Sequence, residues 1–588
     1  MKHASKGDLG RTDPTLLEVA RGERPADRIL RNASVVDVFT RTVRNASIAV
    51  VGERIAGVGD YTEAVESIDL CGAYVAPGLI DAHMHVESTM MLPPAFVRAT
   101  TAHGTTGVVL DPHEIANVLG KDGIRMLMQA SEGLDMNCFF ALSSCVPSSP
   151  LETSGAELSA DDLEPMFDDP RVVALAEVMN FPGVVSADPS VMAKVRLGLA
   201  HGRVDGHCPG LTGKALQAYA AAGISSEHEC TTAEQALERV RAGMRVFIRE
   251  GSAAKNLHAI LPAVTPDNAH RFCFCTDDRH PEDLVRIGHI DHCVRLAIEA
   301  GLDPIIAICM ATLHPAEHYN LHDLGAIAPG RFADMLIFDD LTSPVFRDVY
   351  FHGRRTTSSD ESLSDPSAHS YTVPQIAYNT VHIPDTLSAD DLKIPASTFQ
   401  RIRVIEMDPD QIVTGESRHT PKIENSTCVS DPDRDILKIC VIERHHGTGN
   451  IGLGFVHGFG IRRGAIASTV GHDAHNLIAV GTNDQDIIAA AQALAAVGGG
   501  QCAVCNGQTL AVLRLPIAGL MSELSSEPLI QEQQHLLHAV KELGCPIHDP
   551  FMPMSFLVLP VIPKLKLTDL GLVDVEQFKV VPIGTDDG

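Results

Sequence analysis

The alternation of apolar and polar positions predicts short β-strands in the first part of the chain. Along residues 28–75 the pattern is typical of strands that bury one face. Gly52 and Gly59 mark turns within this stretch. The expected strands are residues 29–38, 47–51 and 54–59, and together they predict a small β unit.

From residue 76 to about residue 318, strand-like apolar runs alternate with amphipathic helical segments. One predicted helix, residues 231–242, begins with Thr231 three residues before Glu234, which is a capping-box pattern. Eight strands in this span favour a (β/α)8 barrel of the TIM type over a doubly wound sheet. The candidate strands are residues 74–85, 107–111, 136–142, 172–178, 204–207, 224–228, 245–249 and 272–276.

The sequence after the barrel predicts two further parts. Residues 323–339 are turn-rich strand sequence, and we expect them to return to the first β unit and complete a small β-sandwich. A polar stretch at residues 354–370 predicts a linker or an exposed loop. Beyond it, a strand at residues 437–442 and a helix at Asp484–Val497 predict an extra α+β domain.

A chain of 588 residues is too long for one hydrophobic core and is expected to divide into domains. We therefore predict an α/β protein with four consecutive parts. These are residues 1–75 as an N-terminal segment and the first part of the β-sandwich, 76–322 as a metal-dependent barrel, 323–373 as return strands and linker, and 374–588 as the C-terminal α+β domain.

The charge balance and the apolar stretches exclude several classes of partner. The chain has 46 Lys+Arg against 75 Asp+Glu, and its formal net charge of −29 repels a phosphate backbone, so we expect no nucleic-acid partner. Residues 1–16 lack the apolar core of a secretion signal, and the longest apolar stretch, residues 487–497, is too short to span a membrane. We expect a cytoplasmic protein that acts on a small molecule. We also expect it to form a homo-oligomer, specifically a dimer.

Fourteen cysteines without a secretion signal predict reduced thiols. Two pairs, Cys273 with Cys275 and Cys502 with Cys505, have spacings that also occur at metal sites. Each pair lacks a second pair nearby and lies in strongly apolar sequence. We interpret them as buried structural thiols.

Two histidines at the end of the first predicted barrel strand point to a metal centre. Residues i and i+2 of a strand project from the same face, so His83 and His85 lie side by side. Two adjacent imidazoles suit a divalent metal ion. Histidines that only fill a core usually occur singly, and burying a pair costs free energy. The pair therefore favours a metal-dependent enzyme.

Most of the other predicted barrel strands also end in residues that bind metals, at the edge where barrel enzymes carry their chemistry. Each has a structural explanation when taken alone; Asp277, for example, could cap a helix. The same position at six strand ends favours a shared purpose. These strand ends carry His83 and His85, Asp111 and His113, Glu177, His207, His228, and Asp277.

The set accommodates two divalent ions. His83, His85 and Asp277 are the candidate ligands of one ion, His207 and His228 those of a second, and Glu177 is the candidate bridge. Paired ions can lower the pKa of a bridging water towards about 7 and so produce hydroxide at neutral pH. Asp277 is then the candidate group that accepts the proton and passes it to the leaving group. A mixed set of imidazole and carboxylate ligands can bind zinc, manganese or iron, so the sequence does not identify the metal.

Several motifs resemble the amidohydrolase superfamily of metal-dependent hydrolases, and within it the bacterial adenine deaminases. The superfamily resemblance rests on residues 77–85, which end in the HxH motif, and on residues 328–334. The closer resemblance rests on residues 83–88, 111–114, 177–180, 205–210, 227–229 and 276–278, and on 447–452 and 471–476 in the C-terminal region.

The resemblance implies a function and a set of ligands. It implies hydrolytic deamination of adenine to hypoxanthine and ammonia, a C–N bond hydrolysis that serves purine salvage. The implied metal ligands are His83, His85, Glu177, His207, His228 and Asp277. The expected cofactor is two divalent ions, with Mn2+ preferred and Fe2+ and Zn2+ as alternatives.

In the expected mechanism, metal-bound hydroxide attacks C6 of adenine and Asp277 shuttles the proton. Glu87, Asp111 and His113 lie close to the centre in the chain and are further catalytic candidates, either toward a ring nitrogen or as supports of the ligand histidines. Residues 471–476 could form an active-site lid, a subunit contact or a solvated turn. The sequence does not identify the residues that recognise the purine.

Two other functions compete with adenine deamination. Hydrolysis of a cyclic amide or an N-acyl substrate begins with the same attack on an sp2 carbon, so only the resemblance separates the two reactions. Many relatives bridge their ions with a carboxylated lysine, and here Glu177 takes that place, which argues against a hydantoinase or a dihydroorotase. A non-catalytic scaffold is the third alternative, and the complete ligand set weighs against it.

Overall fold

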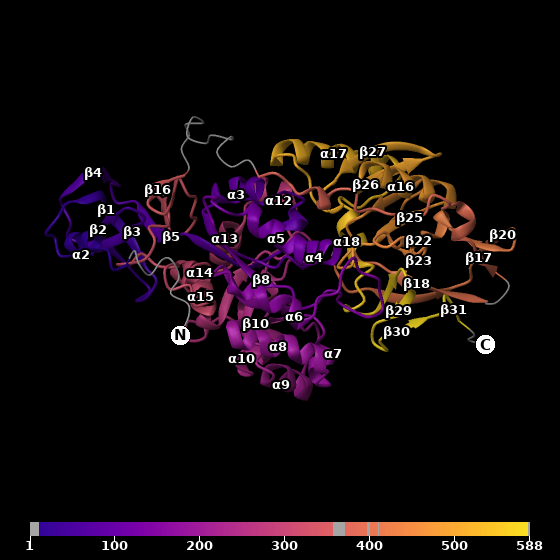
Figure 1. The fold of residues 1–588 in the computed structure, drawn as a ribbon, viewed down its shortest axis with the longest axis horizontal. Coiled ribbons are helices and arrows are strands. Elements are labelled where there is room, and N and C mark those ends of the chain that lie inside the picture. The colour runs from indigo at the N-terminus through magenta and orange to yellow at the C-terminus, as the bar shows by residue number, and fades with distance from the viewer. Residues whose placement is uncertain (1–10, 357–370, 397–399, 410, 586–588) are drawn as a thin grey trace.

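The computed structural model describes residues 11–356, 371–396, 400–409 and 411–585. Figure 1 shows three regions in a row: an indigo sheet at one end, a magenta barrel in the middle, and an orange-to-yellow region at the other end. Within the described residues, no helix combines the length and the apolar character that a bilayer crossing requires.

The central region is a barrel of parallel strands, which confirms the predicted fold. Strands β6 to β10 pair in one parallel run and β11 to β13 in another. The runs are joined where Ser225 N–H donates to Val204 O at 2.9 Å and where Met84 pairs with Asp277. The strands are β6 (Leu79–Met84), β7 (Thr105–Leu110), β8 (Asn137–Leu142), β9 (Val172–Val178), β10 (Arg203–Gly206), β11 (Ser226–Glu227), β12 (Arg245–Arg249) and β13 (Phe272–Cys275).

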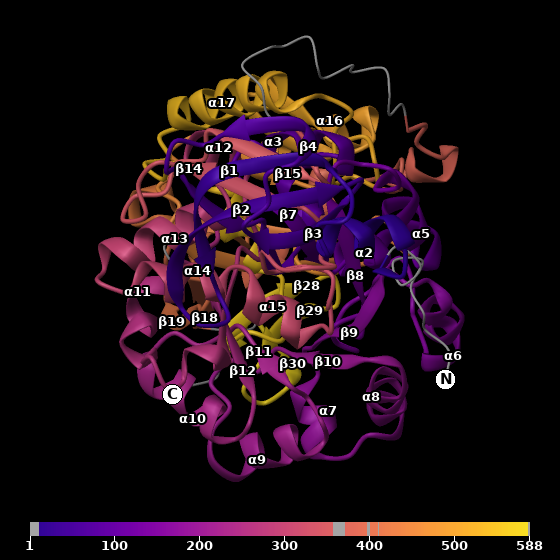
Figure 2. The same cartoon turned by 90° about the vertical axis from the view of Figure 1, so that its left-hand side faces the viewer.

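Helices connect these strands and form the outer layer that Figure 2 shows around the barrel. Their apolar faces pack on the strands, as in α8, which packs on β9 and buries Val195. The principal helices are α3 (Pro93–Thr101), α4 (His113–Leu119), α5 (Lys121–Ala130), α8 (Pro189–His201), α9 (Gly213–Ala221), α10 (Ala233–Arg241), α13 (Ile290–Glu299), α14 (Pro304–Met310) and α15 (Leu313–His318).

Segments from both sides of the barrel form one flanking sheet, as predicted for the return strands. Its central contact is the antiparallel pairing of β14 with β5, in which Leu336 lies opposite Ala76. Strand β4 was not predicted. The strands are β1 (Ala26–Asp37), β2 (Thr42–Val51), β3 (Arg54–Gly59), β4 (Ala64–Asp69), β5 (Tyr74–Pro77), β14 (Met335–Phe338), β15 (Asp348–Phe351) and β16 (Arg354–Arg355).

The prediction of one strand over residues 74–85 was wrong, because the chain changes sheets at Gly78. β5 before it belongs to the flanking sheet, and β6 after it begins the barrel. A Cβ atom at Gly78 would lie 2.0 Å from Oγ1 of Thr106. Only glycine allows this approach between the backbone and β7. An uninterrupted apolar run carries no sign of such a change.

The predicted helix at residues 231–242 exists as α10, but its capping residue was assigned one position too early. Thr232 is the N-cap, and its side chain accepts a hydrogen bond from Gln235 N–H. Thr231 instead donates its own N–H to Oε1 of Gln235 at 2.9 Å. Adjacent threonines offer two competing caps, and Gln235 replaces Glu234 as the partner.

The C-terminal region is built on a mixed sheet with strand order β19-β18-β23-β22-β25-β24-β26-β27. The predicted strand at 437–442 is β22, and α16 has the predicted bounds. The main elements are β18 (Arg401–Glu406), β19 (Gly415–His419), β22 (Ile436–Ile442), β23 (Ile451–His457), β24 (Ala465–Ser468), β25 (Leu477–Gly481), α16 (Asp484–Val497), β26 (Gly500–Cys505), β27 (Gln508–Arg514), α17 (Ser526–Glu542), α18 (Phe551–Phe556), β28 (Leu565–Thr568), β29 (Gly571–Asp574) and β30 (Lys579–Val581).

The structure also bears on the two cysteine pairs and on the predicted linker. Cys273, Cys275 and Cys502 are buried free thiols, as predicted, while Cys505 is only half-buried. Burial raises the pKa of Cys273 and of Cys502 to about 12, which keeps both protonated. Of the predicted linker at 354–370, residues 354–355 form β16, and residues 357–370 lie outside the described part of the chain.

We predict that Gly78→Ala destabilises the protein, because the added methyl group overlaps a β-branched side chain that the barrel holds in place. The expected cost is roughly 1–3 kcal/mol, as for other overpacked sites. Thermal unfolding measures it. Adding Thr106→Ala to the same chain should recover part of the loss, and an unchanged midpoint in the single variant would contradict the role given to Gly78.

Candidate metal centre

The structure brings the six predicted metal ligands together at the carboxyl-terminal end of the barrel. β6 carries His83 and ends just before His85, while Glu177 lies in β9. The other three follow β10, β11 and β13. Each side chain belongs to a residue that is at most 5% exposed, so the cluster is shielded from solvent. The six are His83, His85, Glu177, His207, His228 and Asp277.

The carboxylate of Glu177 lies between two pairs of imidazoles. Its Oε1 is 3.3 Å from Nε2 of His85 and 3.6 Å from Nε2 of His83. Its Oε2 is 2.7 Å from Nδ1 of His207 and 3.3 Å from Nε2 of His228. Each oxygen therefore faces a different pair, which is the arrangement of a carboxylate shared by two cation positions.

Asp277 faces the first pair and is held from behind by an arginine. Its Oδ1 is 3.0 Å from Nε2 of His85 and 3.3 Å from Nε2 of His83. Its Oδ2 accepts a hydrogen bond from Nη1 of Arg249 at 2.7 Å, and Arg249 is also paired with Glu229. Burial raises the pKa of Asp277, but the charge of Arg249 and the hydrogen bonds with His83 and His85 together outweigh burial and hold that pKa well below its usual value. Asp277 is thus ionised and fixed in orientation.

Several ligand atoms in this cluster are buried without a well-aligned hydrogen bond, although Oε2 of Glu177 and Nδ1 of His207 lie close together. The atoms without such a bond are Nε2 of His83, Oε2 of Glu177, and both ring nitrogens of His207. Leaving such atoms unsatisfied costs free energy, whereas a divalent cation uses their lone pairs. The cluster of imidazole nitrogens and carboxylate oxygens fits a divalent metal centre.

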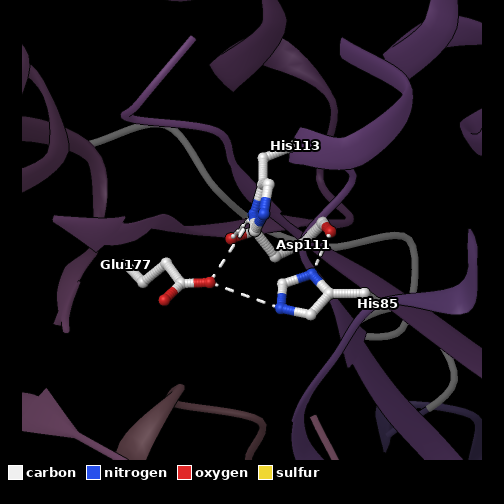
Figure 3. Close-up of side chains that lie close together, drawn as sticks. All are labelled: His85, Asp111, His113 and Glu177. Carbon is white, nitrogen blue, oxygen red and sulfur yellow. Dashed lines mark hydrogen bonds and ion pairs between the residues drawn. The ribbon is translucent and has the colours of Figure 1, made fainter. Parts of the chain in front are cut away.

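Asp111 and His113 lie beside the ligands, as Figure 3 shows. The backbone oxygen of Asp111 is 3.0 Å from Nδ1 of His85 and orients that ring. The Asp111 carboxylate bonds Nδ1 of His113 at 3.0 Å, and the same nitrogen is 3.5 Å from Oε1 of Glu177. His113 borders the cavity above the centre, whereas Asp111 supports both rings from outside it.

Glu87 does not border that cavity. Its Oε1 accepts the N–H of Ile115 at 3.0 Å, so it anchors α4, which begins at His113. Burial raises the pKa of Glu87 to about 7. Its position is that of a support for the ligand-bearing segments.

Cavity residues that the sequence analysis left without a role come from the barrel and from the C-terminal region. Arg249 ends β12, so the strand-end argument would have found it had it been applied to the seventh strand. Glu114, Glu229 and Asp278 adjoin predicted site residues. The C-terminal region adds His472, Asp473, Phe556, Leu559 and Ile562, together with Ile412.

Residues 471–476 lie at the cavity above the candidate metal centre, which His472 and Asp473 border. All six are buried, so the solvated-turn alternative was wrong. Nδ1 of His472 is 2.6 Å from Oε1 of Glu114, and Nε2 of His475 contacts the other oxygen of that carboxylate. This segment therefore covers the mouth of the barrel and contacts Glu114, the neighbour of His113 in the chain.

Comparison with known proteins assigns the chain to a family. Residues 74–361 match the amidohydrolase family, and residues 411–579 match the adenine deaminase C-terminal domain. An adenine deaminase of Desulfatibacillum aliphaticivorans is 47% identical over 97% of this chain and 99% of its own. The chain belongs to the adenine deaminase family of amidohydrolases.

A second full-length relative agrees with this membership of the adenine deaminase family. Adenine deaminase 2 of Carboxydothermus hydrogenoformans is 47% identical over 97% of this chain and 99% of its own. Among solved structures, a β-aspartyl dipeptidase of Fervidobacterium islandicum AW-1 covers 56% of this chain and 96% of its own, with 17% identity and a TM-score of 0.42.

We predict that Glu177→Gln weakens the retention of divalent metal at least about tenfold, because the negative charge shared by the two ion positions is lost. Replacing a residue that only supports a metal ligand already lowers metal affinity by about that factor. Metal analysis after dialysis against a chelator measures the effect. Glu152→Gln is the control: Glu152 is buried outside the cluster and accepts from Ser148 at 2.6 Å. Equal retention in both variants would contradict the role of Glu177.

Proposed function

We propose that the protein hydrolyses adenine to hypoxanthine and ammonia, in the cytoplasm and in the service of purine salvage. The observation that carries the proposal is the similarity to an adenine deaminase along 97% of the chain at 47% identity. The proposed quaternary structure is a homodimer, with no nucleic-acid or membrane partner.

Two Mn2+ ions are the proposed cofactor, with Fe2+ and Zn2+ as alternatives. His83, His85 and Asp277 would hold one ion, His207 and His228 the other, and Glu177 both. When bound, paired ions would lower the pKa of a water towards about 7 and so supply the nucleophile. The unpartnered buried atoms of His83, Glu177 and His207 support this division of ligands.

Asp277 is the proposed proton carrier. Arg249 occupies its Oδ2, which leaves Oδ1 on the side of His83 and His85. Oδ1 takes the proton released as water adds to C6 of adenine and passes it to the amino group. The C–N bond then breaks, ammonia leaves, and hypoxanthine remains. The low pKa of Asp277 keeps the carboxylate ionised, so Oδ1 carries no proton before water adds.

His113 is the proposed contact to the purine ring among the three remaining candidates. Asp111 bonds its Nδ1, so Nε2 is directed away from Asp111, toward Glu114 at 3.2 Å. Asp111 and Glu87 act as positioning residues, the first through His85 and His113, the second through the start of α4.

No observation favours the competing functions. Hydrolysis of a cyclic amide needs the same nucleophile, and the full-length relatives carry the name of adenine deaminase instead. A non-catalytic scaffold does not account for six buried ligand residues within one cluster.

The substrate assignment predicts that Mn2+-loaded protein converts adenine, followed by its ultraviolet absorbance, and leaves adenosine, guanine and cytosine unchanged. Protein stripped of metal should be inactive and regain activity when Mn2+ is restored. Turnover of a hydantoin or a dihydropyrimidine without turnover of adenine would overturn the assignment.

For Asp277→Asn we expect kcat to fall about 10²- to 10⁴-fold, the range of general acid–base catalysis. Steady-state kinetics with adenine measures the fall, and circular dichroism checks the fold. Metal analysis of the same sample separates loss of proton transfer from loss of an ion. An unchanged kcat would contradict the role of Asp277.

A further inference from the structure

The C-terminal region forms the roof of the cavity above the metal centre. The connection between β24 and β25 contributes His472 and Asp473. The end of α18 and the residues after it contribute Phe556, Leu559 and Ile562. The barrel provides the metal ligands below, so any substrate at the centre lies between the two regions.

The segment of the roof formed by residues 471–476 is held in place by hydrogen bonds. Arg444 is buried and donates to the backbone oxygens of His475, Thr469 and Ala518. Nδ2 of Asn476 donates to the backbone oxygen of Thr153 in the barrel region at 2.7 Å. The segment is therefore a preformed wall, fixed from both sides.

Asp473 is the one roof carboxylate that borders the cavity, within the described residues. It is 1% exposed, and its Oδ2 makes no hydrogen bond. Its Oδ1 lies 3.7 Å from Nε2 of His113 and 3.9 Å from Nδ1 of His472. A buried carboxylate oxygen without a donor costs free energy, so the site favours a ligand that brings an N–H group.

The other carboxylates that line the cavity are already engaged. Glu114 pairs with His472 and His475, and Glu229 pairs with Arg249. Asp278 accepts from Ser88, while Asp277 and Glu177 face the ligand imidazoles. Outside the predicted metal ligands, Asp473 is thus the cavity carboxylate that remains available to accept from a substrate N–H.

The roof also presents flat and apolar surfaces. The ring of Phe556 stacks on that of His472, with centroids 4.5 Å apart and an interplanar angle of 13°. Met179, Leu559 and Ile562 border the same cavity. A planar aromatic ring that carries an N–H donor matches these walls, and a purine base such as adenine has that character.

We propose that Asp473 is a substrate-binding residue, whose carboxylate accepts a hydrogen bond from the imidazole-ring N–H of adenine. This inference rests on the proposed function and adds that recognition of the free base comes from the C-terminal domain. A base substituted at that ring nitrogen has no N–H to donate, and it leaves Asp473 buried and unpaired.

The test compares adenine with 7-methyladenine and 9-methyladenine, which both lack the ring N–H. For Asp473→Ala we expect kcat/KM on adenine to fall about 10- to 100-fold, the size of a hydrogen bond to a charged group, with most of the change in KM. The kcat/KM of the methylated bases, or their Ki as competitive inhibitors, should stay the same. Asp473→Asn, which keeps an acceptor, should lose less.

Asp569→Ala is the matched control. Asp569 is a C-terminal carboxylate that is 3% exposed and accepts from N and Oγ1 of Thr153, so it joins the same two regions outside the cavity. We expect this variant to affect all three bases equally. Metal analysis of every variant verifies that the centre is intact.

An equal loss on all three bases in Asp473→Ala, or no loss on adenine, would overturn the recognition role. A wild-type protein that binds its metal but does not deaminate adenine would refute the proposed function itself. The two failures are therefore distinguishable, because the first requires an active wild type.

Discussion

The active site depends on the burial of one carboxylate, Glu177, between two pairs of histidines. A negative charge that is removed from water needs a compensating interaction. The imidazoles around the Glu177 carboxylate provide it, and they belong to His83, His85, His207 and His228. Strand ends place these groups, so the geometry does not rely on mobile loops. The metal centre, the orientation of Asp277 by Arg249 and the supports from Asp111 are arranged around that carboxylate.

The C-terminal domain completes the site. His472 and His475 both contact the carboxylate of Glu114, which lies next to His113 in the chain. Nδ1 of His113 is in turn 3.5 Å from Oε1 of Glu177. Contacts therefore run from the roof to the centre of the barrel. A covered mouth also limits bulk water around the reacting groups, which strengthens the electrostatic interactions inside.

The sequence predicted those parts of the site that obey local rules. Strand alternation and the shared edge of a barrel were enough to place His83, His85, Glu177, His207, His228 and Asp277. The contact between Glu114 and His472 joins residues 358 positions apart, and no local pattern encodes it. The change of sheets at Gly78 escaped prediction because it depends on the distance to Thr106.

Anomalous diffraction from crystals of the Mn2+-loaded protein tests the central claim most directly. The account predicts two manganese peaks at the mouth of the barrel, one on each side of Glu177, each bound by one of its carboxylate oxygens. A single peak that does not touch Glu177, or no peak among these side chains, would contradict it.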